Sequence, residues 1–183
     1  MKKSQRKSFV GSARCIFLVA IAALLLVVGI IVYQTRPVRV IGKKQDALIA
    51  GIEKRNAARM KRMVAESYED KWGFDDDEAI EAIVDVGSQF MALVLTAENR
   101  EIEIEGERAT VKVDLTVSGK PVGPVGNEVT RRLNRLTNPF VFEWEKQSFL
   151  PSSWRLVRID HEDLPAELYG YEPGDIRRAM KGE

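Results

Sequence analysis

One short stretch combines residue types that could bind a metal ion. Four consecutive acids, Asp75 to Glu78, follow the aromatic residues Tyr68, Trp72 and Phe74. Carboxylates are calcium ligands, but a calcium loop needs alternating ligands and a central glycine, which DDDE lacks. Asp75 and Glu78 instead have the spacing of a capping box, which closes the first turn of a helix. We therefore expect a helix to begin here, and no metal site.

The chain offers few groups for acid–base or nucleophilic chemistry. Its sole histidine, His161, lies at the end of a predicted strand beside Asp160, Glu162 and Asp163. A histidine next to a carboxylate is a candidate general base, but the same pattern is typical of an exposed surface position, which we expect here. The sole cysteine, Cys15, lies in an apolar segment. No thiolate nucleophile, disulfide or zinc site is therefore expected in the rest of the chain.

These residues belong to a chain in which one segment is suited to a lipid bilayer and the rest is suited to water. Residues 15–33, CIFLVAIAALLLVVGIIVY, carry no charge. As a helix this run is long enough to cross a hydrocarbon core of ~30 Å. Cleavage as a secretory signal is the alternative, but no small-x-small cleavage pattern follows. We expect a retained single-pass anchor in the cell (inner) membrane, with residues 1–14 as a basic cytoplasmic tail and the C-terminal domain periplasmic or extracellular.

The charge of the chain is distributed unevenly. Residues 1–44 carry nine bases and no acid, which leaves 19 bases against 27 acids in the remainder. An acidic domain argues against nucleic acid as a partner, because binding to phosphates needs a basic surface. Without disulfides the domain must be held together by a hydrophobic core, for which its length is sufficient.

Hydrophobic periodicity predicts two helices after a linker at residues 34–44. The first helix is expected from about Gln45 to Tyr68, with Met60 on its apolar face. Asn56 falls in the middle of that face. A buried amide needs partners, so Asn56 either bonds to neighbouring backbone or looks into a cavity.

The second helix is expected to follow the capping box and to run to about Phe90. Its apolar residues share one side, and Glu78, Glu81 and Asp85 fall on the opposite side. We expect these three acids to face solvent.

Beyond Phe90 the hydrophobic period changes from 3.6 to 2, which predicts antiparallel strands. The alternating stretches are residues 101–105, 109–118, 140–145 and 154–161. The glycine- and proline-rich residues 119–126 are expected to form a loop, and residues 129–136 fit either a strand or a helix. The polar residues 164–183 are expected to be a loosely packed tail.

Four segments, SYEDKWGFDDDEAI, GERATVKVDL, FVFEWEKQ and SSWRLVRID, resemble the nuclear-transport-factor-2-like, or SnoaL-like, superfamily over residues 45–163. Members of this superfamily wrap a strongly curved sheet around a long helix and so form a cone with an open pocket. The resemblance implies an α+β fold: an N-terminal transmembrane helix followed by a cone-shaped domain of helices packed in a curved antiparallel sheet. Such a fold does not by itself identify a function.

We interpret the chain as a membrane-anchored, non-catalytic binding or assembly module of unknown ligand. Binding would use a pocket lined by Asn56, Met60, Tyr68 and Trp72, or the outer sheet face, through which similar domains often form dimers. The expected partners are the membrane, a second copy or a membrane-complex subunit, and a small apolar ligand.

Two other functions stay open. The first is a membrane-tethered isomerase or dehydratase that acts on a small apolar molecule, with His161 or Tyr68 as the base and Asn56 as a hydrogen-bond donor. The second is a structural subunit of an envelope complex. None of the three functions requires a cofactor.

Overall fold

A computed structural model describes residues 21, 23–29, 36–165 and 171–181. The chain divides into two compact units, Met1–Arg36 and Pro37–Glu183. In the first unit residues 21 and 23–29 are helical, and Arg36 lies outside any helix. Among the described residues, no helix has both the length and the apolar character needed to cross a membrane. Most of the predicted anchor, residues 15–33, lies outside the described residues.

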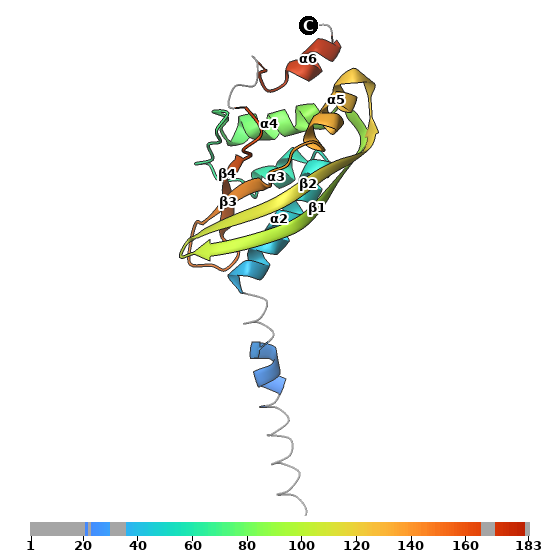
Figure 1. The fold of residues 1–183 in the computed structure, drawn as a ribbon. Helices are drawn as coiled ribbons and strands as arrows, with labels where there is room; N and C mark the ends of the chain where they lie inside the picture. Colours follow the sequence, from blue (N-terminus) through green and yellow to red (C-terminus); the bar gives the residue numbers. More distant parts are fainter. Residues whose placement is uncertain (1–20, 22, 30–35, 166–170, 182–183) are drawn as a thin grey trace, which may run out of the picture. The chain divides into compact units, whose positions relative to one another are not determined.

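The larger unit has an α+β architecture with one four-stranded antiparallel sheet in the order β1-β2-β3-β4. Its strands are β1 (Phe90–Glu105), β2 (Arg108–Pro121), β3 (Phe140–Lys146) and β4 (Trp154–Asp160). Its described helices are α2 (Pro37–Glu53), α3 (Ala57–Lys61), α4 (Asp76–Gly87), α5 (Gly123–Leu133) and α6 (Asp175–Lys181). The sheet is curved, and α2 and α3 pack against one of its faces (Figure 1).

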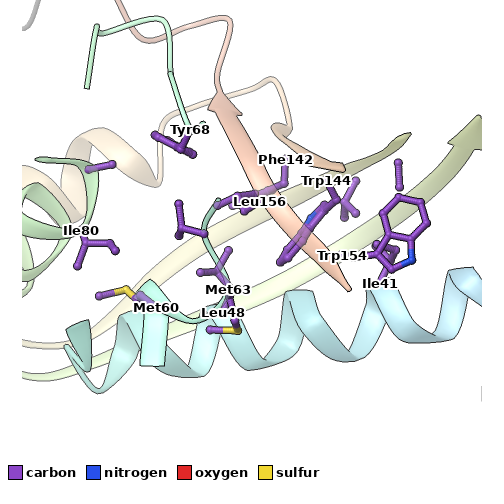
Figure 2. Close-up of a cluster of buried hydrophobic side chains, with 14 of the residues drawn as sticks. Ile41, Leu48, Met60, Met63, Tyr68, Ile80, Phe142, Trp144, Trp154 and Leu156 are labelled. Carbon is purple, nitrogen blue, oxygen red and sulfur yellow. The ribbon is translucent and has the colours of Figure 1, made fainter. Parts of the chain in front are cut away.

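The core lies between that face and the helices. Alternation places the apolar side chains of each strand on the same face, where β2 and β3 pair Val111 with Phe142 and Ala109 with Trp144. Helix α2 adds Ile41 and Leu48 from the opposite side, and the buried cluster extends from Ile41 to Ile80 (Figure 2). This arrangement confirms the predicted α+β fold with helices packed in a curved antiparallel sheet.

The single helix predicted from Gln45 to Tyr68 is wrong. Helix α2 begins at Pro37, inside the expected linker, and ends at Glu53. Arg55 adopts a positive φ of 51°, which a continuing helix does not allow, and Asn56 starts α3. The chain then turns so that Val64 forms a parallel bridge with Leu156 and covers the free edge of β4.

The second predicted helix is confirmed as α4, with its capping box. The Asp75 side chain accepts the backbone N–H groups of Asp77 and Glu78, and Glu78 accepts the N–H of Asp75 at 3.1 Å. One detail of that prediction is wrong, because Asp85 has no exposed surface instead of facing solvent.

Asp85 is buried because the C-terminal residues cover it. It accepts the Tyr171 hydroxyl at 2.9 Å and the backbone N–H groups of Ile176 at 3.0 Å and Arg177 at 2.9 Å. The prediction of a loosely packed tail is therefore wrong for the described part of it, since α6 is bound to α4.

The strands agree with their predicted positions, but β1 begins at Phe90 and is longer than expected. The uninterrupted apolar letters FMALVL do not alternate, so the period of 2 is not visible there. Residues 119–126 were expected to be a loop, yet Gly123 begins α5, which continues to Leu133 and resolves the ambiguous segment as a helix.

Candidate functional site

The predicted pocket residues do not line a described cavity. Met60 and Tyr68 are 0% and 4% exposed and belong to the hydrophobic core, where Figure 2 shows them among the buried side chains. Trp72 is half-buried, and its indole N–H donates to the Pro165 carbonyl at 2.9 Å. Asn56 is exposed. The burial expected for Asn56 is therefore wrong, but the alternative in which its side chain bonds to neighbouring backbone is confirmed.

Asn56 caps helix α3. Its Oδ1 accepts the backbone N–H of Arg59 at 2.9 Å, which satisfies one of the free donors at the helix start. The prediction placed it on an apolar face because a continuous helical wheel was assumed. The preference of asparagine for the N-cap position was the signal in the sequence that pointed to a new helix.

Replacing Asn56 with alanine is expected to lower the free energy of unfolding by about 1 kcal/mol, because the Arg59 N–H loses its side-chain acceptor and keeps only the Asn56 carbonyl at 3.1 Å. Asn56→Asp is the matched control, since aspartate caps as well as asparagine. Urea denaturation of the three proteins measures the difference. A loss with Asn56→Asp equal to that with Asn56→Ala would contradict the capping role.

Hydrogen bonds of Tyr68 and Asp70 stabilise the segment that connects α3 to α4. The Tyr68 hydroxyl donates to Asp70 Oδ2 at 3.1 Å, and Asp70 Oδ1 accepts the backbone N–H groups of Trp72 at 2.9 Å and Phe74 at 3.1 Å. Burial, with the nearby Asp70 charge, raises the pKa of Tyr68 far above its ordinary value, and burial raises the pKa of Asp70. Tyr68 is therefore a hydrogen-bond donor at neutral pH and is unsuited to act as a base.

His161 is completely buried, so the prediction of an exposed histidine is wrong. Its ring packs edge-on against Phe140, with 4.3 Å between ring centroids. Nδ1 accepts the backbone N–H of Asp163 at 3.1 Å, so we assign the ring proton to Nε2, which has no hydrogen-bond partner among the described residues. Burial lowers the pKa of His161, and the opposing effect of the Asn138 backbone is smaller.

The charged neighbours of His161 hold the backbone in place. Lys71 forms an ion pair with Asp160 at 2.9 Å and donates to the His161 carbonyl. The Asp163 carboxylate accepts the backbone N–H groups of Thr137 and Asn138, and these bonds keep the pKa of Asp163 well below its ordinary range. Within the described part of the chain no hydrogen bond joins Tyr68 to His161, so the two candidate bases belong to separate networks.

The buried, neutral His161 is expected to make the larger unit less stable in mild acid. Its folded pKa is lowered, so between that pKa and the unfolded value of about 6.5 the unfolded chain binds more protons than the folded chain. The contribution is complete above about pH 6.5 and is lost as the pH falls, by up to about 1.4 kcal/mol per pH unit. Unfolding measured from pH 8 to 5 should show this loss in the wild type.

The variant His161→Phe supplies the comparison, because no other histidine titrates in this chain. The difference in unfolding free energy between the two proteins should change with pH in this window. If the free energies of unfolding of the two proteins changed equally with pH, the imidazole would have the same pKa in the folded and unfolded states.

A groove of about 560 Å³ lies on the other, polar face of the sheet. We call it the polar-face groove, and side chains from all four strands and from the segment before Asp70 line it. It contains five glutamates and two arginines: Glu69, Glu103, Glu105, Glu143, Glu145, Arg108 and Arg158. Alternation along β1 and β3 puts Glu103, Glu105, Glu143 and Glu145 on the face opposite the core. It did not show that this face is hollowed.

Comparisons with known proteins identify the fold only. No family model and no curated protein matches the chain. Among solved structures, it is similar to the hexachlorocyclohexane dehydrochlorinase LinA-type3 from Novosphingobium barchaimii, with 15% identity and a TM-score of 0.51 over 73% of this chain and 90% of that one. It is also similar to Bd1075 from Bdellovibrio bacteriovorus, with 8% identity and a TM-score of 0.51 over 68% of this chain. That match spans only 40% of the Bdellovibrio protein.

A third similar structure is an NTF2-like protein from Cytophaga hutchinsonii, with 13% identity and a TM-score of 0.46 over 66% of this chain and 92% of that one. Identities at this level are informative about architecture and not about activity. Together with the four-stranded curved sheet and its packed helices, the two likenesses with a TM-score of 0.51 show that the larger unit shares its α+β fold with these structures.

Proposed function

We propose that this protein is a single-pass membrane protein whose larger unit serves outside the membrane as a non-catalytic binding or assembly module. The observation that carries the proposal is that the interior of the larger unit is filled with side chains, whereas a groove is open on its polar face. Trp144, Trp154 and Phe142, each at most 2% exposed, fill the region between helices and sheet where a substrate would be held. The polar-face groove lies on the opposite side of the sheet.

The groove favours a partner with a basic surface. Its seven charged side chains have a net charge of −3, and Glu143 and Glu105 are exposed. Lysine and arginine side chains on a partner would pair with these carboxylates, and Arg108 and Arg158 would select for acids placed between them. A second copy of this chain, or another subunit of an envelope complex, has the size to cover a groove that spans all four strands.

Charge reversal tests this role. The full chain is purified in detergent, and its sedimentation is compared with that of Glu105→Lys/Glu143→Lys and of Glu98→Lys/Glu101→Lys. The control pair is also exposed and lies on β1, outside the groove. We expect association, either with itself or with a companion crosslinked in its own membrane, to be lost only in the groove variant. A wild-type chain that stays monomeric without a companion in that membrane would contradict the proposal.

Membrane anchoring and export have separate tests. The uncharged run at residues 15–33 supports an anchor, and the basic residues before it support a cytoplasmic N-terminus. An anchored chain resists extraction by alkaline carbonate. An alkaline phosphatase fusion after Lys146 should be active if the larger unit is exported, whereas an expressed but silent fusion would contradict export.

The second candidate function is an enzyme that transfers a proton from a small apolar molecule. It is favoured by one observation, the buried imidazole of His161, whose Nε2 has no hydrogen-bond partner among the described residues and would accept a substrate proton only in the other tautomer. A similar structure is a hexachlorocyclohexane dehydrochlorinase. Release of chloride from hexachlorocyclohexane by the wild type, abolished in His161→Phe, would establish this function in place of the first one.

A further inference from the structure

The turn between β3 and β4 presents two apolar side chains to solvent. Phe149 is 86% exposed and Leu150 is 51% exposed. Phe149 has the highest exposure among the large hydrophobic residues that the structure describes. Exposing a phenylalanine to this extent sacrifices the burial of a large apolar area, so the pair requires an explanation.

The turn is a defined structure. The single proton of the Ser153 hydroxyl is shared between the carbonyls of Ser148 at 2.7 Å and Leu150 at 2.8 Å, and the Ser153 N–H donates to the Leu150 carbonyl at 3.1 Å. Ser153 Oγ also accepts the N–H of Ser148 at 3.1 Å. Because the polar groups of the turn bond to one another, the turn holds Phe149 and Leu150 outward with little unsatisfied backbone.

The turn lies at the end of the larger unit where α2 begins (Figure 1). Trp154, the first residue after the turn, lies beside Ile41 of α2 (Figure 2). Burial lowers the pKa of Lys44, and the positive charge of Arg155 lowers it further. Arg155 of β4 therefore lies close to Lys44 of α2. The exposed pair therefore lies close to the first residues of α2.

This end of the unit is apolar at its tip, with bases on the α2 side and both acids and bases on the side of the β1–β2 turn. Helix α2 contributes Arg39, Lys43 and Lys44 and no acid before Asp46, and Val38 is 51% exposed beside them. The β1–β2 turn reaches the same end, because the Glu107 carbonyl accepts the N–H of Lys146 at 2.9 Å, and it adds both acids and a base. An exposed aromatic and aliphatic pair with a cluster of lysine and arginine on one side is typical of a surface that binds a lipid interface.

We propose that this end of the larger unit docks on the bilayer surface, with Phe149 and Leu150 in the boundary between headgroups and acyl chains and the basic residues of α2 against anionic headgroups. The inference rests on the anchor of the proposed function. The apolar run ends at Tyr33 and α2 begins at Pro37, so at most about 14 Å of extended chain separates α2 from the anchor. That length keeps the start of α2 within reach of the interface, and apolar side chains there enter by ~5–10 Å.

The depth of a spin label tests the proposal. In the full chain with Cys15→Ser, a label is attached at Leu150→Cys, which keeps Phe149, or at Met91→Cys as the control. Met91 is 66% exposed and lies at the opposite end of β1 from the β1–β2 turn. The proteins are placed in phosphatidylcholine vesicles with and without phosphatidylglycerol. Collision with oxygen, which concentrates in lipid, is compared with collision with a water-soluble nickel chelate.

We expect the label at residue 150 to favour oxygen and the label at residue 91 to favour the chelate. Phosphatidylglycerol should increase the preference at residue 150, and Phe149→Ser or Arg39→Glu/Lys43→Glu should reduce it. Equal access of both labels to the chelate, in protein that resists carbonate extraction, overturns the inference and leaves the anchor intact. Extraction by carbonate overturns the anchor itself.

A partner protein on the turn would give a different result. The label at residue 150 would then be shielded from oxygen and chelate in the native membrane, and would be accessible to the chelate in vesicles of pure lipid. This outcome also overturns docking on lipid.

Discussion

Replacing Trp144 with alanine is expected to lower the free energy of unfolding by about 3 to 5 kcal/mol, because the indole is 1% exposed and its removal leaves a cavity in the core. The same change should create a binding site. Apart from the Gln45 amide the side chains around the indole belong to the hydrophobic core, so the cavity should accept a small apolar molecule such as benzene, and the variant should gain stability on addition of benzene whereas the wild type should not.

The comparison depends on the partner of Trp144. Its indole N–H donates to Gln45 Oε1 at 3.2 Å, and Gln45 Nε2 has no partner among the described residues. Trp144→Phe keeps much of the packing but removes the donor to Gln45, which costs about 1 to 3 kcal/mol. Adding Gln45→Leu to Trp144→Phe should restore part of that loss, since the orphaned amide is then gone.

Chemical denaturation of these four proteins decides whether the cone is packed or hollow. A loss below about 1 kcal/mol for Trp144→Ala would mean that the indole lines open space, since a filled core cannot lose a tryptophan so cheaply. Stabilisation of the wild type by benzene would point the same way. Either result would support a substrate pocket between the helices and the sheet.

The parts of the fold that were predicted correctly are those determined by local patterns. Alternation over residues 101–105 and 109–118 gave the β1–β2 pairing, because each strand must bury one face and expose the other. Asp75 and Glu78 gave the start of α4, since a capping box involves only residues within one turn. In both cases the determining contacts lie close together in the sequence or repeat along one strand.

The errors arise where distant segments determine burial. Asp85 lies on the polar side of α4, and its bonded partners are 86 to 92 residues later in the chain. His161 stands among acids, which suggested exposure, yet Phe140 covers its ring. The hydrophobic period of one helix or strand contains no information about which later segment will pack over its polar side.

The candidate site follows the same division. Alternation within β1 and β3 places four of the five groove glutamates on the face opposite the core, whereas Glu69 lies outside the strands. The groove itself could not be predicted from the sequence, because its presence depends on how β4 and the segment before Asp70 approach the curved sheet. The placement of Asn56 was wrong for another reason, because it was positioned on a helix that in fact ends at Glu53.

Replacing Asp85 with alanine is expected to release α6 from α4. The change leaves the Tyr171 hydroxyl and the N–H groups of Ile176 and Arg177 without their acceptor, and it removes an ion pair of 3.3 Å with Arg177. These losses should reduce the free energy of opening of α6 by about 2 to 4 kcal/mol. Amide hydrogen exchange at Ile176 and Arg177 should accelerate on the order of a hundredfold or more.

Glu81→Gln is the control for Asp85→Ala. Glu81 lies one turn earlier on α4 and binds the same Arg177 at 2.6 Å, but both side chains are more than a third exposed. An exposed pair contributes about 0 to 1 kcal/mol, so exchange at the two amides should change less than tenfold. Equal acceleration in both variants would mean that charge on α4, and not the buried acceptor, holds α6. If exchange accelerates only in Asp85→Ala, the buried carboxylate holds α6. A negative charge is unfavourable near the C-terminal end of α4, and the free N–H groups at the start of α6 then stabilise the Asp85 carboxylate there.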